Sequence, residues 1–336
     1  MTNFHGMPQH ASYILREKSE HMPTMQNQFR GCLVGLAVGD ALGGPAEFLS
    51  RFEVAQRYGG VLRKMVGGGW LKLKPGETTD DTAMARVLAE SIVARGLLDV
   101  DDVAARYVAW LATKPKDVGN ITKLALRAWE KGVTLPAAAM GAHRQLGGKS
   151  AGNGTIMRCA PLALRYAYDE RKLMDASRDE ALITHFDPQA WTGSVAVNLL
   201  IHHLLHGMSF GDAVCQVAYR IRREPRAACE VAEVLETIKP NIRSDTLPTT
   251  GYVLDTLRVA VWALLAHDSF EDAVIAAINL GGDADTQGAV TGALAGARWG
   301  YTAIPEQWLA PLQARDELIA LAERLLELAE RGRVVV

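Results

Sequence analysis

Apolar residues recur at three- and four-residue spacing along almost the whole chain from Phe29 onward. That spacing places them on one face of an α-helix, and the apolar/polar alternation of a strand is scarce. The exception is 59–75, a glycine-punctuated stretch that fits a short hairpin or an ordered loop. The pattern predicts one compact all-α domain with helices over 29–42, 82–95, 100–113, 119–131, 155–166, 190–206, 210–220, 226–237, 252–266, 270–279, 286–298 and 314–331.

Glycine recurs at every fourth residue in one of these helices, at Gly288, Gly292 and Gly296. Each glycine disfavours a helix by about 1 kcal/mol relative to alanine. Small residues on one face let two helix backbones approach closely. The repeat therefore predicts a central helix whose packing, or whose ligand, needs the space.

Residues 1–27 differ from the rest, with methionines, histidines, prolines and polar residues before the first apolar period. We expect an N-terminal appendage: a flexible leader, an over-long start with Met25 as the true first residue, or a segment that docks on a partner or across the active site. The folded domain is predicted to span 28–336.

The charge balance excludes several classes of function. With 36 basic and 38 acidic residues, no overall field draws the protein to nucleic acid or an anionic membrane. No stretch is apolar over the ~18 residues of a membrane span, and no secretory start is present. Without a C-x-x-C pair, the four cysteines are predicted to be buried free thiols in a reducing cytoplasm: Cys32, Cys159, Cys215 and Cys229.

Two acidic clusters precede helices about 200 residues apart. Each holds two carboxylates and at least one hydroxyl: Thr78-Thr79-Asp80-Asp81-Thr82 and Gly281-Gly282-Asp283-Ala284-Asp285-Thr286. Taken alone, Thr79-Asp80-Asp81 fits a helix cap with solvated charge, since Asp and Thr favour helix N-termini. Four carboxylates brought together, however, need compensating cations. The pair therefore predicts oxygen ligands for two divalent cations, Mg²⁺ or Mn²⁺.

These clusters belong to a longer series of motifs that resembles the ADP-ribosylglycohydrolases over about residues 29–331. The series is Phe29-Arg-Gly-Cys-Leu-Val-Gly-Leu-Ala-Val-Gly-Asp-Ala-Leu-Gly, Glu47-Phe48, Thr79-Asp80-Asp81-Thr82, Gly152-Asn153-Gly154 with Met157-Arg158, Thr184-His185 and Gly282-Asp283-Ala284-Asp285-Thr286. Lys64-Met65-Val66-Gly67-Gly68-Gly69-Trp70-Leu71, Leu73-Lys74-Pro75-Gly76 and Asp117-Val118-Gly119-Asn120 further resemble the bacterial dinitrogenase reductase-activating glycohydrolases.

The resemblance implies an orthogonal helical bundle with a binuclear metal cleft at helix ends, and hydrolysis of the N-glycosidic bond between ADP-ribose and arginine. It implies six metal ligands, Thr79, Asp80, Asp81, Asp283, Asp285 and Thr286. Glu47, Asp80 and Asp283 are the implied catalytic residues, with Glu47 activating or positioning water. The implied substrate-binding residues are Gly119, Asn120, Ser150, Gly152, Asn153, Gly154, Met157, His185 and Tyr252.

Some of these residues have alternative interpretations. His185 matches a family position near the metals and phosphates, although a lone histidine is often structural. His202 and His206 have a zinc-compatible spacing, but a partly exposed helix face explains them better. Trp70 and Tyr252 fit stacking on adenine, with core packing the favoured interpretation for both.

Ser150 departs from the pattern of the nitrogenase-associated relatives, which carry an aspartate there that is implicated in meeting the guanidinium. Other branches of the family carry serine, which contacts ADP-ribose. The position therefore leaves the linkage open between arginine and another residue.

The sequence thus predicts a metal-dependent hydrolase that removes ADP-ribose from a mono-ADP-ribosylated protein, dinitrogenase reductase or another target. One alternative is an immunity protein against an ADP-ribosyltransferase toxin, acting by hydrolysis or by occlusion of the toxin with residues 1–27. Another is a non-catalytic ADP-ribose-binding protein, although a pure binder has little reason to assemble so costly a charge cluster.

Overall fold

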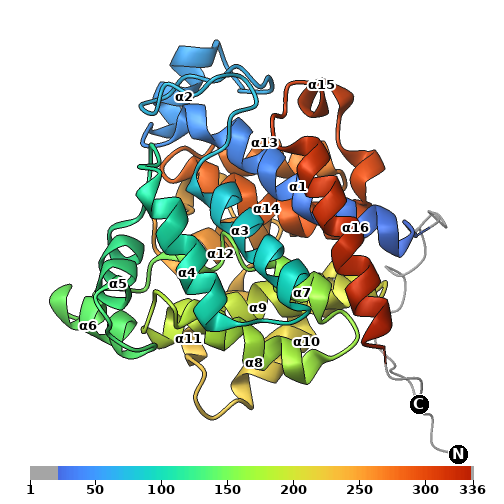
Figure 1. Cartoon of the computed structure of the whole chain (residues 1–336). Coiled ribbons are helices and arrows are strands. Elements are labelled where there is room, and N and C mark those ends of the chain that lie inside the picture. Colours follow the sequence, from blue (N-terminus) through green and yellow to red (C-terminus); the bar gives the residue numbers. More distant parts are fainter. Residues whose placement is uncertain (1–21, 334–336) are drawn as a thin grey trace, which may run out of the picture.

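The computed structural model describes residues 22–333, which form a single bundle of helices without a β-strand in that part of the chain (Figure 1). The helices are α1 (Met25–Gly43), α2 (Arg51–Tyr58), α3 (Asp80–Arg95), α4 (Val100–Ala112), α5 (Asn120–Glu130), α6 (Ala137–Gln145), α7 (Ala160–Arg165), α8 (Glu170–Ala181), α9 (Pro188–Leu205), α10 (Phe210–Arg222), α11 (Cys229–Thr237), α12 (Val253–Ala266), α13 (Phe270–Ile278), α14 (Ala284–Trp299), α15 (Glu306–Leu309) and α16 (Arg315–Arg331).

Helices α1 and α14 lie at the centre of the bundle and run antiparallel with their backbones in contact (Figure 1). Four small residues of each helix meet in register: Gly31 with Gly296, Gly35 with Gly292, Gly39 with Gly288 and Gly43 with Ala284. A Cβ on Gly39 would lie 1.8 Å from the carbonyl oxygen of Gly288, so no side chain fits there. The predicted use of the α14 glycines for close packing is confirmed, and α1 supplies the matching stripe.

The twelve predicted helices are all present, with shifted ends, and the all-α fold class is confirmed. The largest error is at 155–166, where the helix begins only at Ala160; Asn153–Thr155 form a short 3-10 turn (η2), and Pro161 lies in the first turn of α7. Helices α2, α6, α8 and α15 were not predicted. Helix α2 buries only Val54, so it has no apolar stripe to detect.

Three smaller expectations concern the segment 59–75, the cysteines and membrane-spanning helices. The segment 59–75 is an ordered loop with one isolated bridge, between Gly68 and Leu73. All four cysteines are free, but Cys215 and Cys229 are exposed, so the prediction of burial was wrong for these two; both lie on outward faces of surface helices. Among residues 22–333 we find no helix long and apolar enough to cross a membrane.

The predicted boundary of the N-terminal appendage falls inside α1, which begins at Met25 with Thr24 as its N-cap. Residues 25–27 are therefore helical. Residues 1–21 lie outside the described part of the chain, so the division into an appendage and a 28–336 domain stays a prediction.

Candidate active site

The α1–α14 pairing brings three acidic segments to one end of the bundle. Helix α1 ends at Gly43, directly beside the first residue of α14, and continues through a 3-10 turn (η1, Gly44–Ala46) to Glu47. Asp283 precedes α14, and Asp285 lies in its first turn. Helix α3 begins with Asp80 and Asp81. Carboxylates from residues about 240 positions apart therefore share one site.

Asp40 attaches the start of α3 to α1. Its buried carboxylate accepts hydrogen bonds from the backbone N–H of Thr79 (3.0 Å), the backbone N–H of Thr82 (3.1 Å) and the Thr82 hydroxyl (2.5 Å). Thr79 is the N-cap of α3 and accepts from the backbone N–H of Asp81. Because Asp40 and Thr79 cap the helix, Asp80 and Asp81 are not needed as caps.

At α14 the N-cap is Asp283, and its side chain makes no capping hydrogen bond. Its carboxylate instead accepts a hydrogen bond from the side-chain amide of Asn153. The capping interpretation of Thr79-Asp80-Asp81 is confirmed for Thr79, but the charge is not solvated, because Asp80 and Asp81 are buried. Both clusters leave carboxylates free to face the space between them.

Backbone hydrogen bonds connect the loops around the site. The N–H of Phe48 donates to Gly282 and that of Gly282 to Leu49, each at 2.7 Å. The N–H of Asn153 donates to Gly251 at 3.0 Å. Gly282 has φ +70° and a Cβ there would lie 2.0 Å from the carbonyl oxygen of Thr249, so only glycine suits the position. The acidic loop is therefore held by its neighbours.

These loops enclose a cavity of about 550 Å³, within the usual size for a small-molecule site. All the predicted site residues line it except Thr79 and Tyr252. Thr79 lines a smaller pocket of about 130 Å³ behind Asp80. Tyr252 lines an adjoining pocket of about 450 Å³ that shares Ser150 and Gly152 with the main cavity.

Burial and mutual repulsion strongly disfavour the charged forms of the carboxylates in this cavity. Burial raises the pKa of Asp80 to about 8, reinforced by Asp117 and Asp40. Burial followed by the charge of Asp285 raises the pKa of Asp81, and burial followed by the charge of Asp283 raises that of Asp285. In a metal-free cavity these groups cannot all stay ionised.

The same residues fit divalent cations. Asp81 Oδ2 and Asp285 Oδ1 are buried without a hydrogen-bond partner, which is unusual for native carboxylates. Single oxygens of Glu47, Asp117 and Asp285 lie within 4.8 Å of one another. Hard cations such as Mg²⁺ bind carboxylate and hydroxyl oxygens of this kind. The buried carboxylate cluster is therefore a candidate metal centre.

Glu47 is held from the cavity mouth by Trp70, whose indole N–H donates to Glu47 Oε2 at 2.6 Å. Burial raises the pKa of Glu47 to about 8, while the hydrogen bond from Trp70 opposes that rise. The Trp70 ring lies against Phe48, with ring centroids 5.4 Å apart. Phe48 has φ +61°, which is rare for a bulky residue and marks a functional constraint.

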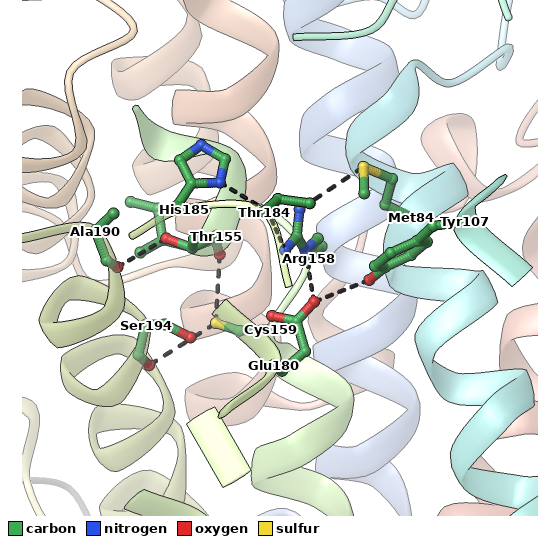
Figure 2. A network of polar contacts seen from close by, with 11 residues as sticks. Met84, Tyr107, Thr155, Arg158, Cys159, Glu180, Thr184, His185, Ala190 and Ser194 are labelled. Carbon is green, nitrogen blue, oxygen red and sulfur yellow. Dashed lines mark hydrogen bonds and ion pairs between the residues drawn. The ribbon is translucent and has the colours of Figure 1, made fainter. Parts of the chain in front are cut away.

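The adjoining wall is the glycine-rich turn at 152–154, which packs directly against the ring of His185. A Cβ on Gly152 would lie 3.3 Å from His185 Nε2, and one on Gly154 would lie 3.0 Å from Cε1. His185 is itself held from behind by Thr184 and the buried Arg158 (Figure 2). Burial, followed by the charge of Arg158, lowers the pKa of His185 to about 3, so the ring is neutral.

Sequence reasoning missed two carboxylates of this site. Asp117 lines the cavity between α4 and α5; it was part of a recognised motif but received no role. Asp40 was likewise part of a recognised motif without a role, although a single acidic residue in an apolar helix is a detectable signal. Core packing was the wrong interpretation for Trp70, 50% exposed, and for Tyr252, 36% exposed, because both lie at cavity mouths. His202 is half-buried and His206 exposed, as predicted.

A family model described as ADP-ribosylglycohydrolase matches residues 21–334. The chain is 36% identical to the ADP-ribosyl-[dinitrogen reductase] glycohydrolase of Rhodospirillum rubrum, covering 89% of this chain and 98% of that protein. It is 34% identical to the ADP-ribosylarginine hydrolase Tri1 of Serratia proteamaculans (strain 568), covering 89% and 79%. A solved structure titled ADP-ribosylglycohydrolase-related protein complex superimposes with a TM-score of 0.78 at 35% identity, covering 91% and 99%. The chain therefore belongs to the ADP-ribosylglycohydrolase family.

Proposed function

We propose that the protein hydrolyses the N-glycosidic bond between ADP-ribose and an arginine side chain, releasing ADP-ribose from a mono-ADP-ribosylated protein. The observation that carries the proposal is the 550 Å³ cavity, in which buried carboxylates from α3 and α14 face a glycine-rich turn. Two relatives that match 89% of the chain are named as hydrolases of ADP-ribosylated substrates, and one of the names specifies ADP-ribosylarginine. These features favour an enzyme over a protein that only binds ADP-ribose.

We assign two divalent cations, Mg²⁺ or Mn²⁺, to the acidic wall, held by Thr79, Asp80, Asp81, Asp283, Asp285 and Thr286. Cations there would neutralise the carboxylates, orient the ribose hydroxyls and acidify bound water. The orphaned oxygens of Asp81 and Asp285 support this assignment. The hydroxyl of Thr286 lies 3.4 Å from Asp81 Oδ1, which links the two acidic segments.

The two ends of the cavity suit the two parts of the substrate. At the glycine-rich end, Gly152, Asn153, Gly154, Met157 and His185 would contact the ADP-ribose, since backbone N–H groups of such a turn approach phosphates without obstruction. Tyr252 and Ser150 line the adjoining 450 Å³ pocket, where we place the adenosine. Gly119 and Asn120, at the start of α5, would complete this wall.

Beside Glu47 and Asp285 in the acidic wall, Asp117 offers a carboxylate to the arginine guanidinium. Its pKa is raised by burial, which a guanidinium partner would counter. Ser150 has no carboxylate to offer the guanidinium, and its hydroxyl is already hydrogen-bonded to the ring of His143 at 2.5 Å. Asp117 therefore supports the arginine linkage that the serine had left open.

The reaction needs little acid catalysis, because the guanidinium of the substrate is already protonated and leaves as neutral guanidine. The residues must hold the ribose, stabilise an electron-poor anomeric carbon and direct water to one face. We propose that Glu47, which accepts a hydrogen bond from Trp70, positions or activates that water. Asp80 and Asp283 would hold the metals, and Asp283 also fixes the acidic loop through its hydrogen bond from Asn153.

The direct test is release of ADP-ribose from an arginine-ADP-ribosylated protein with Mg²⁺, with Mn²⁺ and with EDTA. We expect release to require metal and to be lost in Asp283→Ala, because Asp283 connects the acidic loop to Asn153. Tight ADP-ribose binding without release under any metal would contradict the arginine linkage. Release that persists in EDTA would contradict the metal assignment.

Replacing Trp70 with phenylalanine is expected to shift the pH dependence of this reaction. The indole N–H stabilises ionised Glu47, so its loss raises the pKa of Glu47 further above the ordinary value. A reaction that needs the carboxylate then loses rate as the pH falls, and the acid limb of kcat/KM moves to higher pH in Trp70→Phe. Phe48→Leu, which keeps the hydrogen bond between Trp70 and Glu47, is the control. If the acid limb of the pH profile stays in place in both variants, Trp70 does not have this role.

Partners and compartment follow from the same proposal. The macromolecular partner is the modified protein itself, dinitrogenase reductase or another target. The four free cysteines suit the cytoplasm. No feature of residues 22–333 favours a toxin partner, nucleic acid or a membrane, so we do not extend the immunity alternative. Residues 1–21, most of the segment expected to dock on a partner, lie outside the described residues.

A further inference from the structure

A fully buried chain of hydrogen bonds ends at the cavity on His185 (Figure 2). Arg158 Nε donates to Glu180 Oε1 at 2.7 Å, and Arg158 Nη2 donates to Thr184 Oγ1 at 2.8 Å. Thr184 Oγ1 lies 2.8 Å from His185 Nδ1. Arg158, Glu180 and Thr184 are each 0% exposed, so water does not substitute for these contacts.

The direction of each hydrogen bond follows from the chemistry of its donors. A guanidinium has five N–H donors and no acceptor, so the Thr184 oxygen must accept from Arg158. The single hydroxyl proton of Thr184 is then free to donate to His185 Nδ1. In the opposite arrangement, with a proton on Nδ1, the Thr184 hydroxyl would keep a buried proton without an acceptor, at about 1–3 kcal/mol.

We infer that Arg158 and Thr184 fix His185 as the tautomer protonated on Nε2, so that the ring presents an N–H donor to the phosphate or ribose oxygens of ADP-ribose beside the glycine-rich turn. Nε2 is the ring atom nearest Gly152, and His185 lines the cavity. The other tautomer would present a lone pair and repel an anionic oxygen. This inference rests on the proposed function, which places ADP-ribose in the cavity.

Two further contacts show how firmly Arg158 is oriented. Its guanidinium carbon lies 5.1 Å from the centre of the Tyr107 ring, and the Tyr107 hydroxyl donates to the same Glu180 oxygen at 3.0 Å. Glu180 comes from α8, Thr184 follows that helix, and Tyr107 comes from α4. The positive charge of Arg158 also opposes a second proton on His185, whose pKa is lowered. Arg158 and Thr184 are thus positioning residues.

The test begins with long-range ¹H–¹⁵N spectra of the ligand-free protein, which identify the protonated ring nitrogen of His185. We expect Nε2 in the wild type and a loss of that preference in Thr184→Val, which removes the hydroxyl but keeps the shape. Binding of ADP-ribose, measured by calorimetry, should weaken by roughly 10-fold or more in Thr184→Val, as for a lost hydrogen bond to a charged group. Thr184→Ser, which keeps a hydroxyl, should retain both the proton on Nε2 and the wild-type affinity for ADP-ribose.

Thr192→Val is the matched control, since Thr192 is equally buried, its hydroxyl accepts the backbone N–H of Ala228, and neither residue lines the cavity. A second pair of variants keeps the inference testable if Thr184→Val does not fold. Glutamine places an N–H donor where Nε2 lies and asparagine where Nδ1 lies, so His185→Gln should bind ADP-ribose more tightly than His185→Asn.

Three outcomes would overturn the inference: a proton on Nδ1 in the wild type, unchanged affinity in Thr184→Val, or tighter binding by His185→Asn than by His185→Gln. Absence of ADP-ribose binding by the wild type would instead contradict the proposed function. The spectrum of the ligand-free protein decides the tautomer in that case too.

Discussion

Asp285→Asn is expected to make the metal-free protein more stable and to slow hydrolysis about 1,000-fold. In the wild type, burial and the charges of Asp283 and Glu47 raise the pKa of Asp285, so the folded state binds a proton that the unfolded state releases. Asparagine has nearly the same shape and no charge. We expect the Tm in EDTA to rise by about 2 °C or more, since 1 kcal/mol moves the Tm of a domain of 150–250 residues by about 2–4 °C.

The sign of the pH dependence provides a sharper test. A carboxyl whose pKa is raised in the folded state lowers the stability of the protein. This cost is absent below the unfolded pKa, about 3.9, and it grows as the pH rises above that value. The gain in Tm from Asp285→Asn should therefore be near zero at about pH 4 and larger at pH 8 than at pH 5. A gain independent of pH would contradict this account of the acidic wall.

Although Asp285→Asn should gain stability without metal, it should bind metal less well and hydrolyse its substrate more slowly. Mg²⁺ or Mn²⁺ should raise the Tm of the wild type by binding only the folded state, and should do so much less in Asp285→Asn. We expect kcat/KM to fall about 1,000-fold, because a metal supplies several kcal/mol of transition-state stabilisation at 1.36 kcal/mol per tenfold. Asp101→Asn, at an exposed position in the first turn of α4, is the control and should change neither Tm nor rate appreciably.

Gly39→Ala is expected to destabilise the whole molecule by more than about 3 kcal/mol, at the upper end of overpacking effects. The new Cβ would meet the carbonyl oxygen of Gly288 at 1.8 Å, and that oxygen belongs to a backbone that cannot turn aside. Helices α1 and α14 would have to separate, which also moves Glu47 away from Asp285. The loss is measured by urea unfolding and by ADP-ribose release.

The matched control is Gly141→Ala, in the middle of the exposed α6, where a Cβ meets nothing within 4 Å. There the higher helix propensity of alanine should stabilise the protein by about 0.5–1 kcal/mol. Both variants make the same chemical change in a helix. Equal effects at the two positions would show that backbone contact between α1 and α14 is not what requires glycine.

The sequence was sufficient where a helix is buried on nearly every side by apolar and small residues. Helices α9, α12 and α14 are lined by apolar residues at helical spacing, and they lie within one residue or two of their predicted ends. Helix α8 escaped prediction because two of its buried residues are polar: Ser177, which bonds to the backbone, and Glu180, which pairs with Arg158. Periodicity treats such residues as surface, and only their partners explain their burial.

The same limit applies to the site. The motif residues Asp80 and Asp283 could be found from local chemistry, since each cluster is acidic, hydroxyl-rich and adjacent to a helix start. The roles of Asp40 and Arg158 depend on which distant segments they meet, α3 for Asp40 and α8 for Arg158. One sequence carries no record of those contacts, so a motif such as Met157-Arg158 was recognised without its function.

The pairing of α1 with α14 has a consequence for how this protein is made. Helix α1 leaves the ribosome roughly 250 residues before its partner, which at about 5–20 residues per second is a wait of roughly 12–50 seconds. Most of α1 is buried in the finished molecule, chiefly against α14, so α3 and α7, which are made earlier, cover only part of its apolar surface during that wait. We expect such a nascent chain to rely on a chaperone, or on a temporary partner helix, until α14 has been made.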